Sequence, residues 1–247
     1  MIELMLGFIL SSTIAVGAYY RESLSTSGAA SAVLMGTLIY GLGGPYLFVL
    51  LMVFFLSTAL IGHFFKDAMP PSRGSLQVIA NGGIATYFAV RYGITAETHY
   101  LVLFAASLAV ATADTWSSEI GRMAKRGPFN PLTFKPMAAG LSGAVSFLGL
   151  FVALLGSLLF GLLGFAYIQE AQAFIIITTA GFAGALIDSL LGLMQVKFID
   201  ESSGTIEDAP SSINIYHSGV RTLTNSGVNI LSNLIVVSVL YALLTNM

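Results

Sequence analysis

The 247-residue sequence contains little charge and no cysteine. Charged residues make up only 9% of the chain, whereas hydrophobic residues make up 56%. A soluble domain usually carries about 25% charged residues, so water could not solvate a surface this poor in charge, but lipid can. The absence of cysteine excludes a disulfide framework and a thiolate metal site.

The charges that are present favour neither sign strongly. The formal net charge is −2, which is too small to argue for an acidic or a basic partner. No basic stripe is present, so we expect no nucleic-acid partner. The N-terminus also lacks the positive region that opens a secretory signal, and the first apolar stretch is therefore predicted to be a retained span.

Long apolar runs dominate the rest of the chain. A helix needs about 20 mainly apolar residues to cross a bilayer. Runs that approach or exceed this length predict eight spans, near 2–20, 27–43, 45–65, 75–92, 98–121, 138–166, 173–195 and 226–245. The first two are the weakest, and one of them could lie in the membrane interface. The sequence thus predicts an all-α integral membrane protein, a polytopic bundle of seven to eight transmembrane helices, as a single domain over residues 1–247.

The positive charges predict the orientation of these spans. Nine of the ten Lys and Arg residues fall in the odd-numbered loops, and only Arg91 falls in an even one. Cytoplasmic loops of membrane proteins carry an excess of Lys and Arg. We therefore expect a multi-pass protein of the cell membrane, with its odd loops in the cytoplasm and both termini outside.

Polar side chains inside the predicted spans gather at one depth, near the odd loops. Such residues are costly in hydrocarbon and usually mark a functional site. They are Gln77 and Asn81 in the fourth span, Asp114, Ser118 and Glu119 in the fifth, Asp188 in the seventh, and Asn225, Asn229 and Asn233 in the eighth.

This combination of side chains points to a metal and to phosphate. Carboxylate and carboxamide oxygens suit Mg²⁺, and we predict Asp114 and Asp188 as its main ligands. Glu119 is a further candidate ligand, but it lies about 140° around an ideal helix from Asp114 and joins the site only if the helix ends or bends. Basic side chains in the neighbouring loop can hold phosphate oxygens. The candidates with a catalytic role are Asp114, Glu119, Asp188 and Lys135, and those for nucleotide or substrate binding are Asn81, Gln77, Ser118, Arg122, Lys125, Asn225 and Asn229.

Structural roles remain open for some of these residues. An intramembrane Asn such as Asn233 often makes a helix–helix hydrogen bond, and the basic residues of the 122–135 loop could merely set topology. A purely structural role for both Asp114 and Asp188 is harder to reconcile with their depth.

The segment Ala113-Asp114-Thr115-Trp116-Ser117-Ser118-Glu119-Ile120-Gly121 resembles the signature of a multi-span membrane family of long-unknown function, which includes the plant and cyanobacterial phytyl-phosphate kinases. Four further segments fit the family in order: Gln77–Gly82, Gly140–Ser146, Asp188–Gly192 and Val228–Asn233. The resemblance covers nearly the whole chain. The sequence departs from the family pattern in two places: Ala138-Ala139 stands where Pro-Pro is frequent, and Ser226 stands where an Asp is common.

The resemblance implies a Mg²⁺-dependent kinase that transfers a phosphoryl group from a nucleoside triphosphate to a prenyl monophosphate, such as phytyl or polyprenyl phosphate. Kinship to CTP-dependent polyprenol kinases and CDP-diacylglycerol synthases favours CTP as the donor. Because the acceptor phosphate is already anionic at neutral pH, no strong general base is needed, and no His lies among the motif residues.

Other functions remain open at this point. One alternative is a prenol kinase or a cytidylyltransferase that uses the same metal site, and another is an ion-coupled transporter. Intramembrane carboxylates of a transporter would lie near the midplane, whereas these are predicted nearer one face. The sequence leaves open the prenyl chain length, the nucleotide and whether the protein forms a homo-oligomer.

Overall fold

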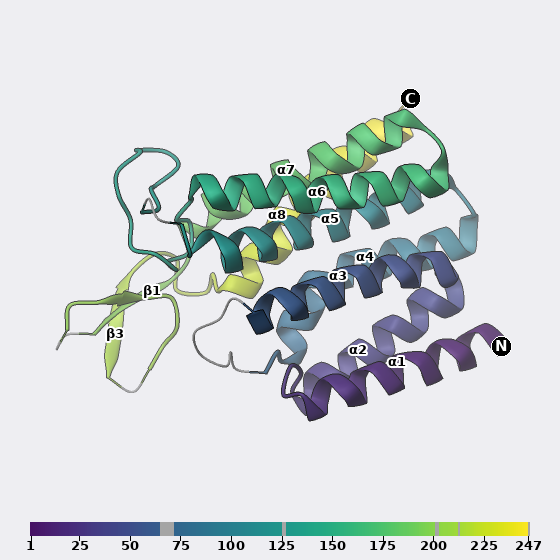
Figure 1. The fold of residues 1–247 in the computed structure, drawn as a ribbon, viewed down its shortest axis with the longest axis horizontal. Coiled ribbons are helices and arrows are strands. Elements are labelled where there is room, and N and C mark those ends of the chain that lie inside the picture. The colour runs from purple at the N-terminus through teal and green to yellow at the C-terminus, as the bar shows by residue number, and fades with distance from the viewer. Residues whose placement is uncertain (65–71, 125–126, 201–202, 212, 247) are drawn as a thin grey trace.

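The computed structural model describes residues 1–64, 72–124, 127–200, 203–211 and 213–246, which fold mainly into helices packed side by side (Figure 1). The elements in chain order are α1 (Ile2–Tyr20), α2 (Thr26–Leu38), the π-helical turn η1 (Ile39–Gly43), α3 (Pro45–Phe64), α4 (Ser75–Thr95), α5 (Thr98–Gly121), α6 (Phe147–Ile168), α7 (Ala171–Gly192), β1 (Lys197–Asp200), β2 (Ile206–Glu207), β3 (Asn214–Ser218) and α8 (Asn225–Thr245).

Six helices in the described ranges are long and apolar enough to cross a membrane: α1, α3, α5, α6, α7 and α8. The remaining two are shorter or more polar. Helix α2 has only 13 residues before it opens into η1, and α4 carries Gln77, Asn81 and Arg91 among its apolar residues. The prediction of a polytopic helical membrane protein is confirmed, with seven to eight spans as an approximate count.

Helix α5 lies at the centre of the bundle. In its apolar window 72% of the residues are buried, compared with 22% for α1. Its buried stretch includes the small residues Ala105, Ala106, Ala109 and Ala113, and small side chains let membrane helices approach closely. Its neighbours α3, α4, α6, α7 and α8 all pack against it, so most residues of α5 are enclosed by protein.

The sixth helix begins later than the sequence predicts. The sequence analysis began this span at residue 138, whereas α6 starts at Phe147. Gly140 and Gly143 adopt φ values of +88° and +86°, a left-handed conformation that interrupts a helix and that glycine tolerates. Ser146 then caps α6 by accepting a hydrogen bond from the Gly149 N–H at 3.0 Å. Residues 138–146 therefore form a loop at the end of the bundle.

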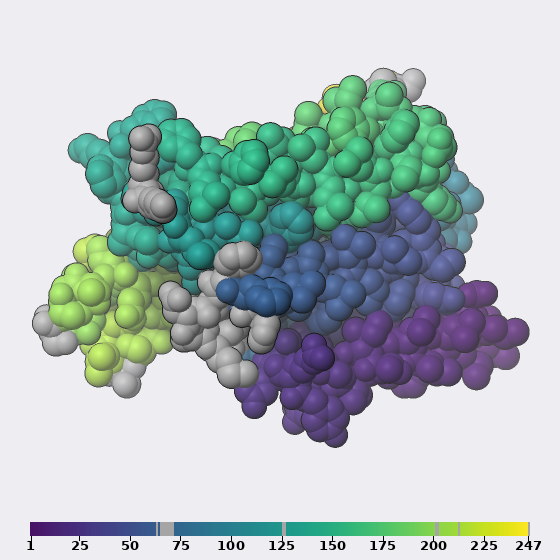
Figure 2. Space-filling view, in the orientation of Figure 1, coloured from purple at the N-terminus to yellow at the C-terminus, as the bar shows by residue number. Residues whose placement is uncertain are grey.

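A small sheet interrupts the helical pattern between α7 and α8. Its strand order is β2-β1-β3, and both pairings are antiparallel. Its strands fall between the last two predicted spans, so this sheet is an addition to the predicted all-α fold. It projects from one end of the bundle, in yellow-green at the left of Figure 2.

The connections alternate between the two ends of the bundle. The sheet and the loops before α2, α4 and α6 lie at one end, and both termini lie at the other (Figure 1). We call the first of these the loop end. Arg21, Arg73, Arg122, Lys135, Lys197 and Arg221 all belong to loop-end segments, whereas Arg91 lies near the opposite end, in the last turns of α4. The described residues thus have the predicted clustering of positive charge.

Candidate functional site

A polar cavity of about 550 Å³ opens at the loop end of the bundle. Helices α3, α4, α5, α6, α7 and α8 supply its walls, together with the 138–146 loop. It collects most of the polar residues singled out in the sequence: Gln77, Asn81, Asp114, Ser118, Glu119, Arg122, Asp188, Asn225 and Asn229 all line it. The volume lies within the range of about 300–1,000 Å³ that is usual for small-molecule and cofactor sites.

The two intramembrane aspartates meet inside this cavity. Asp114 on α5 and Asp188 on α7 lie within hydrogen-bonding range of each other. Ser232 on α8 donates a hydrogen bond from its Oγ to the Asp188 Oδ2 at 2.9 Å. Ser232 is itself 1% exposed, so three helices fix the position of this carboxylate pair.

Two asparagines form a second bridge between helices next to the aspartates. The Nδ2 of Asn229 on α8 donates to the Oδ1 of Asn81 on α4 at 3.0 Å. Within the described part of the chain, the Oδ1 of Asn229 is buried and has no hydrogen-bond partner. An unpaired buried oxygen is costly in a native protein, and in a cavity lined by carboxylates it is a free acceptor site for a cation.

Whether these residues suit Mg²⁺ can be judged from the donor set. Two apposed carboxylates and an unpaired carboxamide oxygen are the hard oxygen ligands that Mg²⁺ takes, and this ion keeps several waters of its own. The residues therefore fit the ion. Over the described ranges, however, no group of three or more His, Cys, Asp or Glu side chains lies close enough together to hold a metal. The fit consequently depends on the Asp114–Asp188 pair with carboxamide and water oxygens.

Glu119 lines the cavity but stands apart from the aspartate pair. Helix α5 stays helical through Gly121, so the bend that would bring Glu119 to the face of Asp114 is not there. Its carboxylate lies 3.8 Å from the Arg122 guanidinium. The structure thus places Glu119 among the cations of the cavity, and its role as a metal ligand stays a prediction.

Arg73 adds a cation that the sequence analysis did not select. It precedes α4, and its Nη1 donates to the Thr58 Oγ1 on α3 at 3.3 Å. Burial lowers the pKa of the Arg73 guanidinium, and the Glu119 carboxylate opposes that shift. An Arg remains protonated despite such a shift. Arg73 and Arg122 therefore both present positive charge to the cavity.

The 138–146 loop is held beside the cavity by a cluster of polar groups that are partly or fully buried. The Ser142 N–H donates to the Asp208 carboxylate at 2.6 Å, and the Ser142 Oγ donates to the Gln195 Oε1 at 2.9 Å. The Lys197 Nζ donates to the carbonyl oxygens of Ser142 and Gly192 at 3.3 and 3.1 Å. The loop is thus held in place by residues that follow α7.

Lys197 and Asp208 also form an ion pair within this cluster, with 3.8 Å between Nζ and Oδ1. Burial raises the pKa of the Asp208 carboxyl, which the Ser142 N–H and Lys197 oppose. Burial lowers the pKa of the Lys197 ammonium, which Asp208 opposes. Each charge thus offsets the cost of burying the other.

The remaining predicted residues divide into three groups. Gln77, Ser118 and Asn225 line the cavity. Lys135 is exposed in the loop before α6 and does not line it, and Lys125 lies outside the described residues. Asn233 lies deeper than the cavity and donates to the Ser107 carbonyl on α5 at 3.1 Å, which is the helix–helix bond left open above.

Sequence reasoning missed Arg73, Asp208, Lys197 and Ser232. The first three lie in connecting segments, where a charged residue carries no depth signal. Ser232 lies one position before Asn233, on the same helix as the asparagines, and its i,i+3 spacing from Asn229 was the available signal.

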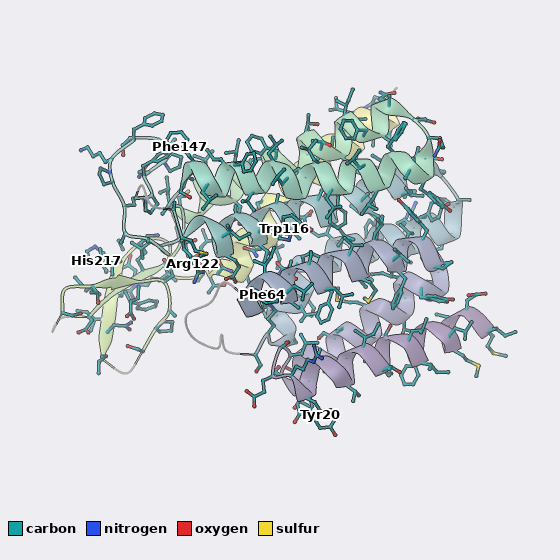
Figure 3. All side chains as sticks on the ribbon, viewed as in Figure 1. Tyr20, Phe64, Trp116, Arg122, Phe147 and His217 are labelled. Carbon is teal, nitrogen blue, oxygen red and sulfur yellow. The ribbon has the colours of Figure 1, made fainter. Side chains whose placement is uncertain are left out.

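Figure 3 shows Arg122 at the loop end of α5, and His217 in the projecting sheet. No described His lines the cavity.

Fold and site together define a polytopic helical membrane protein with a polar, carboxylate-bearing cavity at one end. Residues 9–237 match the model of the family described as integral membrane protein DUF92, and the chain belongs to this family. It is 30% identical to Protein PGR of Arabidopsis thaliana, over 94% of this chain and 93% of that protein. It is also 32% identical to an uncharacterized membrane protein of Methanocaldococcus jannaschii, over 78% of this chain and 84% of that protein. No solved structure matches.

Proposed function

We propose that this protein is a prenyl-phosphate kinase, which transfers the terminal phosphoryl group of a nucleoside triphosphate to a prenyl monophosphate. One observation carries the proposal: the apposed Asp114–Asp188 pair shares a cavity with the unpaired Asn229 Oδ1 and with Arg73 and Arg122. Phosphoryl transfer depends on positioning and on neutralising phosphate charge, and needs both kinds of group. The resemblance of the Asp114–Glu119 block to the phytyl-phosphate kinases supports the same reaction.

The reaction balances without a protein nucleophile. An oxygen of the prenyl phosphate attacks the γ-phosphorus, the bond from that phosphorus to the β,γ-bridging oxygen breaks, and the nucleoside diphosphate leaves with the electron pair. The acceptor oxygen is largely deprotonated at neutral pH, since the second pKa of a phosphate monoester is about 6. The lack of a described His in the cavity is therefore no obstacle.

The acidic and the basic residues of the cavity would have different roles. Asp114 and Asp188 would hold Mg²⁺ with the Asn229 Oδ1, and the bound ion supplies neutralisation of the phosphate oxygens. Arg73 and Arg122 would bind phosphate oxygens directly, since guanidinium groups match their geometry. Ser232 keeps Asp188 in position through its 2.9 Å hydrogen bond.

The location of the cavity suits a substrate that has a phosphate head and an apolar prenyl chain. Asp188 lies four residues, and Asp114 seven, from the loop ends of their helices, or roughly 6–10 Å at 1.5 Å per residue. A water-soluble nucleotide can enter from the loop end, while a prenyl chain stays in the bilayer. A transporter would need its carboxylates near the midplane, so this depth favours the enzyme.

CTP is the first candidate donor, on the strength of the resemblance to CTP-dependent polyprenol kinases. The excess of Lys and Arg at the loop end further leads us to place the cavity on the cytoplasmic side of the cell membrane. Nucleotides would be available there.

The test is product analysis with the purified protein, Mg²⁺ and each nucleoside triphosphate in turn. Geranylgeranyl phosphate and geranylgeraniol are offered side by side, and Asp188→Asn serves as the inactive control. We expect geranylgeranyl diphosphate and an equal amount of nucleoside diphosphate. A nucleotidyl-lipid with pyrophosphate would instead identify a cytidylyltransferase, and preference for the alcohol would identify a prenol kinase. The proposal would be overturned if no combination of nucleoside triphosphate and acceptor gave turnover.

A further inference from the structure

A second cavity adjoins the polar one and differs from it in chemistry. It lies between α1, α2, α3 and α4, and we call it the apolar crevice. Its lining is mainly Ile14, Ala15, Leu24, Ala32, Met35, Gly36, Leu51, Met52, Phe54 and Val78. Apart from the buried Ser11 Oγ, which has no hydrogen-bond partner among the described groups, its polar lining is confined to the side that faces the polar cavity.

The two cavities share a wall. Phe55, Arg73, Gln77 and Asn81 line both of them. Arg73 and Asn81 are also polar groups of the proposed phosphate site. A molecule whose anionic head lies against Arg73 in the polar cavity can therefore continue directly into the apolar crevice.

The volume of the polar cavity indicates that a lipid chain would not lie in it. That cavity, at about 550 Å³, is within the range usual for a single ligand of drug size. A nucleoside triphosphate and an acceptor phosphate would together occupy it. The chain of the acceptor therefore needs a separate, apolar path, and the adjoining crevice provides one.

We propose that the apolar crevice binds the phosphate-proximal part of the prenyl chain, with the phosphate held at the shared wall by Arg73, Gln77 and Asn81. This inference rests on the proposed function. It places the chain among α1–α4.

The size of the crevice limits how much of the chain the protein recognises. It offers about 70 Å³ and is not enclosed, which is well below the roughly 300–1,000 Å³ usual for small-molecule sites. Only the beginning of a chain fits, and the rest must lie against lipid. Met35 and Met52 line it, and their flexible side chains can adapt to an entering chain. The protein should therefore accept prenyl phosphates of different lengths with similar efficiency.

Photo-crosslinking tests this inference without depending on catalysis. The full-length protein in phospholipid nanodiscs is irradiated with geranylgeranyl phosphate that carries a diazirine on its first isoprene unit, and labelled peptides are mapped by mass spectrometry. We expect labelling of α1–α3 near Ile14, Met35 and Met52, and competition by unlabelled geranylgeranyl phosphate. Labelling of α6 and α7 near Leu150 and Phe182, which line the polar cavity, would overturn the inference, as would label that does not compete.

A pair of variants on α2 sharpens the test. Ala32→Phe fills the crevice, whereas Ala30→Phe adds the same ring at an exposed position that does not line it. We expect Ala32→Phe to lower crevice labelling at least tenfold and Ala30→Phe to leave it unchanged. Equal labelling in both variants would count against the crevice, and if Ala32→Phe does not fold, the wild-type map alone decides. Crevice labelling without turnover would refute the kinase activity and support the lipid site. Turnover with labelling elsewhere would support the kinase activity and refute the lipid site.

Discussion

Ser232→Ala provides a sharp test of how the proposed metal site is held together. Ser232 is 1% exposed, and its Oγ donates to the charged Asp188 Oδ2 at 2.9 Å. Hydrogen bonds to charged groups contribute about 1.5–3 kcal/mol. Without the hydroxyl, Asp188 can rotate away from Asp114, but its charge remains.

The expected effect follows from that magnitude. A loss of about 1.4 kcal/mol corresponds to a factor of 10, and removal of a group that orients a metal ligand typically costs about 10–100-fold in metal affinity or activity. We therefore expect the Mg²⁺ concentration for half-maximal turnover to rise about 10–100-fold. Turnover at saturating Mg²⁺ should stay within a few-fold of wild type, since both carboxylates are still present.

The assay is prenyl-phosphate turnover over a Mg²⁺ titration, with Ser157→Ala as the matched control. Ser157 is equally buried, but its hydroxyl donates to the Ala153 carbonyl of its own helix, at 2.8 Å, and it lines neither cavity. Ser157→Ala should lose about 0.5–1.5 kcal/mol of stability, as for a neutral hydrogen bond, and Ser232→Ala about 1.5–3 kcal/mol. An unchanged Mg²⁺ requirement in Ser232→Ala, or an equal rise in Ser157→Ala, would refute the reasoning.

Four further predictions use the same assay or simple labelling. Asp114→Asn and Asp188→Asn should each abolish most turnover with folding intact, because each removes a charge that must balance Mg²⁺; near-normal turnover in either variant would contradict the site. Arg73→Gln should raise the KM for prenyl phosphate about tenfold or more, since charge-assisted bonds contribute about 1.5–3 kcal/mol, whereas Lys135→Ala, which changes an exposed side chain, should have little effect on it. Gly127→Cys should resist an impermeant thiol reagent added outside intact cells, and labelling from outside would reverse the orientation. Geranylgeranyl phosphate should be a far better acceptor than geranylgeraniol in competition, and the opposite order would favour a prenol kinase.

The composition of the site could be predicted because membrane depth is readable from sequence. Asp114, Asp188 and Asn229 each lie a few residues from the loop end of a long apolar helix. Helices that cross the same bilayer side by side bring residues of equal depth to one level. Depth along each helix was therefore sufficient to anticipate that these three side chains meet.

The 138–146 loop could not be predicted in this way. Its Ala, Leu and Val residues have the composition of a span, and its conformation depends on partners far along the chain. Ser142 is held by Gln195, Lys197 and Asp208, none of which is near it in sequence. A Cβ on Gly143 would lie only 2.6 Å from the Leu193 backbone nitrogen, so glycine is required by a tertiary contact that periodicity does not report.

The sheet was missed whereas Glu119 was selected, and both outcomes have local reasons. The strands are two to five residues long, too short for alternation to stand out from a polar loop. Glu119 was judged on an ideal helix, where it faces away from Asp114. The helix is indeed regular there, and Glu119 reaches the cavity because α5 is enclosed by neighbours on several faces.

Helix α4 shows why polarity within a span is informative even when it weakens the hydropathy signal. Gln77 and Asn81 lower its apolar content, and α4 does not qualify as a span by length and composition. The same two side chains form the wall between the polar cavity and the apolar crevice. Lipid-exposed carboxamides would be costly at this depth, but Asn81 is 9% exposed and bonded to Asn229. A helix of this kind is stable in a membrane because its polar face is covered by neighbouring helices. At that covered face, a substrate would place its charged head in the polar cavity and its apolar chain in the apolar crevice.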